Sequence, residues 1–265
     1  MSLPPGRVFI TGASSGIGAA LAREYAARGA SLGLLARRRP LLEELAASLP
    51  HPERHRIYAA DVTDRAALAA AAADFIAAMG GADIVIASAG ISHGTLTERP
   101  ADLAVFDAVF ATNVNATVAT FAPFISPMKT QPGPCRLVGI GSVAGIRGMR
   151  GAGAYCASKA AVHSYCESLR LELRATRIKV VTIAPGYIDT PMTRNNRFPM
   201  PFLMPAERFA AQAADVIARG SSYRVLPWQM GLAAKLLRLL PNALFDLAFS
   251  RAPTKQRIDG QRGEA

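Results

Sequence analysis

Carboxylates are scarce in this chain of 265 residues, where 19 Asp and Glu stand against 30 Lys and Arg and leave a formal net charge of +11. Only five of the 30 basic residues are lysines, and the rest are arginines. Such a charge raises nucleic acid, a membrane surface and an anionic small molecule as partner classes. A GC-rich genome also produces arginine- and alanine-rich chains, so composition alone does not choose among them.

Cysteine is also sparse. The three cysteines, Cys135, Cys156 and Cys166, are odd in number and lack the spacing of metal ligands. A disulfide scaffold is therefore not expected, and a reducing compartment is favoured. The first residues show no basic stretch followed by an apolar one, so we expect no signal peptide and a cytoplasmic protein.

Long apolar runs are missing too. The best candidate for a membrane span, residues 226–249, is interrupted by two basic residues, a proline and an aspartate, so we expect it not to cross a bilayer. No basic stripe alternates with aromatic residues, and no zinc-finger or RNA-binding pattern occurs. Nucleic acid is therefore not expected as a partner.

The chain does have a high apolar content, 51% against 18% charged residues, which excludes a disordered chain. Short aliphatic runs alternate with longer segments of helical spacing. The expected strands are residues 8–10, 32–35, 57–60, 84–86, 137–140, 180–183 and 223–225. The expected helices are residues 17–28, 41–49, 65–79, 102–124, 155–173 and 205–219. This alternation predicts an α/β fold, a Rossmann-like doubly wound parallel β-sheet flanked by helices, as a single domain over 1–265.

A glycine-rich turn, T-G-A-S-S-G-I-G at residues 11–18, follows the first expected strand and opens the first expected helix. Glycines permit a tight turn and a close approach of a ligand to the backbone. The free N–H groups and the dipole of the helix N-terminus then suit a phosphate. In this position the turn predicts a dinucleotide site.

The second expected strand ends in Arg37-Arg38-Arg39, where NAD-binding folds of this type carry an acid for the ribose 2′-hydroxyl. The nearest acids, Glu43 and Glu44, fall within the next helix. Guanidinium groups bind a 2′-phosphate that a carboxylate would repel. We therefore predict NADP(H) as the cofactor, with a solvated basic loop as the alternative interpretation of the arginines.

Three further residues indicate chemistry on a carbonyl. Tyr155 and Lys159 are four apart and share one face of a helix, where an ammonium lowers the pKa of a phenol and makes it usable as an acid or base. Ser142, at the end of the fifth strand, can donate a hydrogen bond to a carbonyl oxygen. The alternative makes Tyr155 a core residue and Lys159 a surface residue.

With Y-C-A-S-K at residues 155–159, Ser142 and the turn at 11–18, the chain resembles the short-chain dehydrogenase/reductase family over about residues 7–226. The resemblance implies an NADP-dependent oxidoreductase that interconverts a carbonyl and an alcohol. It makes Ser142, Tyr155, Lys159 and Asn113 catalytic, with Asn113 linking the lysine to a water-filled proton path. The implied cofactor residues are Gly12, Ser14, Ser15, Gly16, Ile17, Gly18, Arg37, Arg38, Asp61, Val62, Ala89, Gly90, Tyr155, Lys159, Pro185, Gly186, Ile188 and Thr190. No metal is implied.

One position departs from the family pattern. Ser88 stands where an asparagine usually links neighbouring strands, and its hydroxyl can replace part of that bonding. A catalytically silent NADP-binding regulatory or scaffold protein is the competing function, which loss of a catalytic residue would favour. His93 and Cys156 lie near the expected site and are not taken as catalytic.

The resemblance implies that the segment after the sixth expected strand covers the substrate. This segment, residues 191–226, follows the cofactor-binding core of residues 6–190. Its methionines and phenylalanines indicate an apolar substrate cavity. Arg194 and Arg197 either contact an anionic group of the substrate or are solvated. The apolar and basic extension, 227–265, is a lid, an oligomer contact or a weak membrane-surface anchor. The resemblance implies a homodimer or homotetramer.

Overall fold

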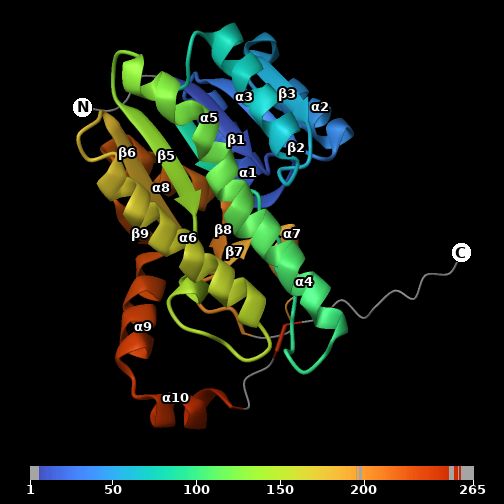
Figure 1. The fold of residues 1–265 in the computed structure, drawn as a ribbon, viewed down its shortest axis with the longest axis vertical. Coiled ribbons are helices and arrows are strands. Elements are labelled where there is room, and N and C mark those ends of the chain that lie inside the picture. The colour runs from blue at the N-terminus through green and yellow to red at the C-terminus, as the bar shows by residue number, and fades with distance from the viewer. Residues whose placement is uncertain (1–5, 195, 197–198, 251–253, 256, 258–265) are drawn as a thin grey trace, which may run out of the picture.

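The computed structural model describes residues 6–194, 196, 199–250, 254–255 and 257, and its centre is a seven-stranded parallel sheet (Figure 1). The order is β3-β2-β1-β4-β5-β6-β9, so the chain reverses direction across the sheet between β1 and β4. The strands are β1 (Arg7–Thr11), β2 (Ser31–Ala36), β3 (His55–Ala59), β4 (Ile84–Ala87), β5 (Cys135–Ile140), β6 (Ile178–Pro185) and β9 (Tyr223–Leu226). The predicted Rossmann-like sheet is confirmed, and its reversal point is where such folds bind ligands.

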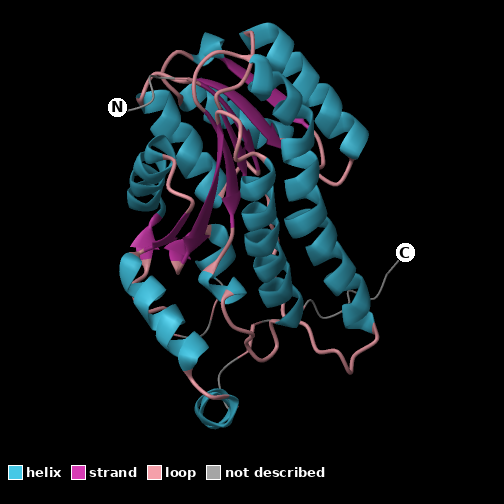
Figure 2. Ribbon diagram, turned by 60° about the vertical axis from the view of Figure 1, so that its left-hand side comes forward, coloured by secondary structure: helices cyan, strands magenta, loops and turns pink. Residues whose placement is uncertain are grey.

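Helices cover both faces of the sheet (Figure 2). One face packs against α1 (Gly16–Ala27), α2 (Arg39–Ser48) and α8 (Ala206–Arg219). The other packs against α3 (Arg65–Met79), α5 (Ala116–Thr130) and α6 (Gly153–Glu172). Because both faces are covered, the inner strands β1, β2, β4, β5 and β6 are buried almost throughout, which is why the sequence shows apolar runs there instead of alternation, whereas the edge strands β3 and β9 keep exposed residues.

The core shows how small and large residues share space on one face. Phe9 packs its ring 5.4 Å from that of Phe75 and 5.0 Å from that of Phe124, measured between centroids. Gly33 lies beside them on β2, and a Cβ there would lie 2.6 Å from Phe9 and from Phe75. Glycine is required at this position because the rings occupy the space of a side chain. A fully buried phenylalanine contributes about 2–3 kcal/mol through its apolar area.

A single long helix crosses the second face in three parts, α4 (Ala101–Phe110), a π-helical turn (Ala111–Asn115) and α5. By length and composition this helix, Ala101–Thr130, could span a bilayer, with a mean hydropathy of 1.3. It is a different segment from residues 226–249, the span that the sequence offered as the best candidate. Its α5 part packs in the core, where Phe121 and Phe124 are fully buried.

Two features of the C-terminal part depart from the prediction. A two-stranded parallel pair, β7 (Ile188–Asp189) and β8 (Met204–Pro205), flanks α7 (Pro191–Arg194). Strands this short carry no periodicity, so the sequence could not show them. Beyond β9, leucines at positions 232, 236, 239 and 240 follow helical spacing, and α9 (Trp228–Leu239) starts four residues before the first of them.

Helix α9 and the following α10 (Asn242–Phe249) extend from the lower end of the molecule in Figure 1. Arg147 attaches them to the body by donating to the carbonyl oxygens of Leu237 and Leu240, at 2.5 and 2.7 Å. Its guanidinium also lies 3.9 Å from the centroid of the Phe245 ring. The large apolar side chains on these helices are exposed: Trp228, Leu232, Leu236, Leu239, Leu244 and Leu247.

Candidate active site

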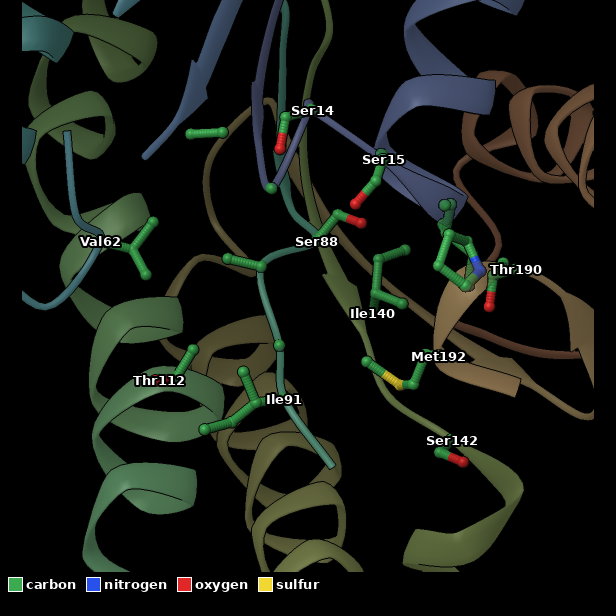
Figure 3. A pocket seen from close by; sticks show the side chains of 18 of the residues that line it. Ser14, Ser15, Val62, Ser88, Ile91, Thr112, Ile140, Ser142, Thr190 and Met192 are labelled. Atoms are coloured by element: carbon green, nitrogen blue, oxygen red, sulfur yellow. The ribbon is translucent and has the colours of Figure 1, made fainter. Parts of the chain in front are cut away.

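A cavity of about 580 Å³ opens at the carboxyl ends of the central strands (Figure 3). Its walls come from the β1–α1 turn and from the residues that follow β2, β3, β4, β5 and β6, with α6 closing one end. Every residue of the predicted cofactor set lines it, as do Ser142, Tyr155 and Lys159. Of the four residues expected to be catalytic, Asn113 lies behind the wall.

The β1–α1 turn forms a cradle at one end of the cavity. Gly12 and Gly16 have φ values of +70° and +56°, in the left-handed region that favours glycine. A Cβ at Gly12 would lie 2.7 Å from the Cα of Ala89, and one at Gly18 would lie 2.2 Å from the carbonyl oxygen of Gly12. Helix α1 begins here, and its N-cap residue Ser15 makes no side-chain cap bond, so the first N–H groups stay available to a phosphate.

The guanidinium groups of Arg37 and Arg38 lie beside this cradle. Arg38 donates to the hydroxyls of Ser14 and Ser15, at 3.1 and 2.9 Å. Arg37 lies 3.8 Å from Asp61, the one carboxylate among the described residues that line the cavity. Asp61 itself accepts the N–H and the hydroxyl of Thr63, at 2.9 and 2.8 Å, and the N–H bond holds the pKa of its carboxyl below the usual range. The end of the cavity is therefore positive.

The residues fit a nicotinamide dinucleotide. The glycine cradle accepts a pyrophosphate, and the hydroxyl of Ser88 is buried on the cavity wall with no partner among the described residues. Such a group needs a hydrogen-bond partner from a ligand. The same observation corrects the expectation for Ser88, because the strand contact here runs from its backbone N–H to the Thr11 hydroxyl, at 3.2 Å, and its own hydroxyl replaces none of the bonding of the asparagine.

Ser142 and Tyr155 meet at the opposite end. Ser142 ends the turn after β5, where its hydroxyl accepts the N–H of Ala144 at 3.1 Å and begins a 3₁₀ turn (Val143–Gly145). Tyr155 lies on the first turn of α6. Burial raises the pKa of its phenol, and a hydrogen bond from Ser142 opposes that rise. The two hydroxyls together offer a proton and a hydrogen bond to one acceptor.

Lys159 lies one turn further along α6 and is 6% exposed. Its ammonium donates to the carbonyl oxygen of Ile140 at 2.9 Å and lies 5.8 Å from the centroid of the Tyr155 ring. Burial lowers the pKa of Lys159 to about 8. The expected lowering of the Tyr155 pKa is wrong for the protein by itself, because burial dominates at the phenol and the ammonium is bonded to a backbone carbonyl.

Asn113 occupies the π-helical turn, and its amide joins two elements. The side-chain oxygen accepts the N–H of Ile91 at 2.8 Å, and the side-chain nitrogen donates to the carbonyl oxygen of Ile91 and to the Ser158 hydroxyl, both at 3.0 Å. None of these bonds reaches Lys159. A Cβ at Gly90 would lie 3.2 Å from the Asn113 oxygen and 3.5 Å from the Lys159 nitrogen, so the Gly90 backbone lies beside both groups.

His163 is a site residue that the sequence analysis missed. Its Nε2 accepts the backbone N–H of Ser142 at 3.3 Å, and burial lowers its pKa to about 4, so the ring is a neutral acceptor at physiological pH. The ring fills the space beside Gly141, where a Cβ would lie 2.2 Å from Nε2. The signal was present, since residues 155, 159 and 163 follow i, i+4, i+8 on one helix face.

The substrate side of the cavity is formed by fewer of the expected residues. Met192 lines the cavity, as does Ser142 (Figure 3). Arg194 is exposed and donates to Asp189 at 3.0 Å, so its charge is already paired, and Arg197 lies outside the described residues. No residue of α9 or α10 is among those that line the cavity.

Known proteins share this sequence and fold. Residues 7–200 match the family model of the short chain dehydrogenases. An uncharacterized oxidoreductase of Myxococcus xanthus is 36% identical over 249 residues, which cover 92% of this chain and 96% of that protein. Two solved structures resemble the fold. A 3-ketoacyl-(acyl-carrier-protein) reductase from Brucella melitensis, complexed with NADH, has a TM-score of 0.76 at 25% identity and covers 83% of this chain and 96% of its own.

The second structure is a short chain dehydrogenase/reductase from Burkholderia phymatum in complex with NAD, with a TM-score of 0.80 at 23% identity over 96% of this chain and 98% of that one. This likeness shows the fold alone. The family match and the relative at 36% identity span most of the chain. The protein is therefore an oxidoreductase of the short-chain dehydrogenase/reductase family.

Proposed function

We propose that the protein interconverts a carbonyl compound and its alcohol with NADP(H). The observation that carries the proposal is the convergence of Ser142, Tyr155 and Lys159 at one end of a cavity whose other end carries Arg37 and Arg38. A proton donor and a cofactor site thus share one enclosed volume.

The residues at the catalytic end have separate tasks in the direction of reduction. When bound, the nicotinamide supplies the hydride that the carbonyl carbon accepts. Ser142 donates a hydrogen bond to the carbonyl oxygen as negative charge develops there. Tyr155 gives its proton to the same oxygen, and its raised pKa keeps the phenol protonated until that moment. Lys159, still charged at neutral pH with a pKa of about 8, stabilises the phenolate that remains.

The choice of NADP(H) rests on the cations after β2. The two solved structures carry NADH and NAD, but the segment after β2 in this chain offers Arg37 and Arg38 and no acid. Arg38 is already held by Ser14 and Ser15, so its fork lies beside the phosphate cradle. Guanidinium groups in this position bind a phosphate bidentately.

The proposal is tested by a screen of ketones and aldehydes in which the oxidation of NADPH, and separately of NADH, is measured. We expect turnover with a subset of carbonyls and a preference for NADPH. Binding of NADPH without turnover on any carbonyl would support the silent regulatory protein, and a preference for NADH would overturn the cofactor assignment.

The exposed apolar surfaces suggest two associations. We propose pairing of the chain through α4, α5 and α6, which expose Leu103, Phe106, Val118 and Leu171, as the resemblance implies. We also propose that α9 and α10 rest on an anionic membrane surface, because exposed leucines adjoin exposed Lys235 and Arg238. Sedimentation tests the first. Flotation with liposomes containing anionic lipid tests the second, and a protein that stays in the unbound fraction overturns it.

A further inference from the structure

The last described residues lie near Tyr155, although none of them is among the residues that line the cavity. Arg257 forms an isolated parallel bridge with Gly94, and its guanidinium makes a two-pronged ion pair with Asp102, with both N···O distances at 2.8 Å. The Asp102 side chain is 5% exposed, at the start of α4. Thr254 packs against Gly151, where a Cβ would lie 2.8 Å from the Cβ of Thr254. Contacts on both sides thus hold this short segment in place.

Lys255 lies between these contacts and points toward the catalytic tyrosine. Its ammonium donates to the hydroxyl of Ser92 at 2.6 Å and lies 5.4 Å from the centroid of the Tyr155 ring. The ammonium therefore lies beside the side chain that is proposed to exchange the proton. Lys255 is partly buried, and its removal from water lowers its pKa.

No residue in the described part of the chain supplies a negative charge to this ammonium. Among the residues that the structure describes, no carboxylate lies within 4.0 Å of Lys255. His93 has its pKa lowered by burial and by the neighbouring Lys255, and burial raises the pKa of the Cys156 thiol, so both are neutral near pH 7. A partly buried cation without a counter-ion is unfavourable, and an anionic group placed beside it offsets that cost.

We propose that Lys255 binds an anionic group of the substrate, so that the enzyme acts on carbonyl compounds that carry a carboxylate, phosphate or sulfonate close to the reacting carbonyl. The proposal rests on the proposed function and defines its substrate class. The point charge of a lysine accepts all three anions, since it requires no planar geometry. Arg194, the cation that the sequence suggested for this role, is exposed and paired with Asp189.

Matched pairs of substrates separate the charge from the rest of the molecule. Levulinate is compared with methyl levulinate, and dihydroxyacetone phosphate with dihydroxyacetone, by kcat/KM at saturating NADPH. The variants are Lys255→Met, Lys255→Arg and, as a control, Lys129→Met, which changes an exposed lysine at the end of α5. If Lys255→Met melts at a lower temperature, Lys255→Gln repeats the measurement with a donor for Ser92 retained.

We expect the wild type to prefer the anionic member of at least one pair. Lys255→Met should lower kcat/KM for that anion on the order of 10- to 100-fold, as loss of a charge-assisted hydrogen bond does. Its effect on the neutral partner should stay within about threefold, since a neutral group makes no charge-assisted bond. Lys255→Arg should keep most of the preference, and Lys129→Met all of it. Equal losses on both members of a pair, or no loss, would overturn the assignment.

A binding measurement distinguishes failure of this inference from failure of the proposed function. The melting temperature of the NADPH-loaded protein is recorded with increasing levulinate or inorganic phosphate, for the wild type and for Lys255→Met. If no carbonyl is reduced, a rise in the wild type that Lys255→Met lacks still supports an anion site at Lys255. No rise in the wild type, or the same rise in both proteins, overturns it.

Discussion

The two ends of the cavity bear positive charge in opposite environments. At the phosphate end the Arg37 side chain is 72% exposed, and it keeps its charge in water at little cost. At the catalytic end Lys159 is 6% exposed, and burial brings its pKa down to about 8. In the proposed function the exposed cation selects the cofactor, and because it is exposed we expect its replacement to leave the fold intact. The buried cation has a catalytic role in the proposed function, and we expect its burial to cost stability.

The largest effect is expected at the proton donor. Tyr155→Phe removes the hydroxyl and keeps the ring, so turnover should fall on the order of 10²- to 10⁴-fold, the usual contribution of general acid catalysis. Affinity for NADPH, measured by fluorescence titration, should change less than about threefold, since the ring remains in place and one lost neutral hydrogen bond has a small effect. Retained turnover would contradict the assignment of the catalytic end.

Reversing the charge at the phosphate end should have the next largest effect. Arg37→Asp should weaken NADPH binding on the order of 10- to 100-fold, because it removes a charge-assisted contact and adds a repulsion. Binding of NADH, which lacks the 2′-phosphate, should hold or improve. Arg39→Asp is the matched control, since Arg39 lies 3.6 Å from Glu43 on α2 and does not line the cavity. Equal losses with both cofactors would exclude a 2′-phosphate contact.

The third test is the pH dependence of protein stability that arises from the buried Lys159. The pKa of Lys159 is lowered to about 8 from 10.5, so the unfolded chain binds more protons between those values. Stability should therefore rise with pH from about 8 to about 10.5, by up to about 3 kcal/mol. In Lys159→Met this rise should disappear, and at pH 7 the variant should melt at or above the wild-type temperature while losing turnover. A clearly lower melting temperature would show that the bond to Ile140 outweighs burial.

His163 gives a smaller effect of the same sign, at lower pH. Its pKa is about 4 in the folded protein against 6.5 in the unfolded chain, so its contribution is present above pH 6.5 and is lost as the pH falls toward 4. Between pH 7 and pH 5 the loss should be on the order of 1 kcal/mol. His163→Gln, whose amide oxygen can still accept the N–H of Ser142, should be less sensitive over this range. An unchanged pH dependence in urea melts would assign the effect to other groups.

Ser88→Ala should have the smallest effect. The Ser88 hydroxyl is buried with no partner among the described residues, so its removal should change the free energy of unfolding by less than about 0.5 kcal/mol. A loss of about 1 kcal/mol or more in the cofactor-free protein would show that a neighbour accepts its proton.

The sequence predicted most of the fold and part of the candidate site. The seven strands of the sheet and six of its helices follow from apolar runs and helical spacing, both of which are local properties. The β7–β8 pair was missed because strands of two residues carry no period. Arg194 was a candidate for substrate recognition by composition, and the structure pairs it with Asp189.

The sequence by itself determined the order of the elements, the glycine turn, the arginines after β2, and the spacing of Tyr155 and Lys159. These depend on neighbours within a few residues along the chain. The tertiary structure alone decided that Lys159 bonds to Ile140, that His163 supports Ser142, and that Lys255 reaches Tyr155 from the end of the chain. Each of these contacts joins segments that are far apart in the sequence and lie together in a buried environment. There, the loss of solvation sets the charge state of a side chain, and the packing of the chain sets its hydrogen-bond partner. No local sequence pattern encodes either of these effects.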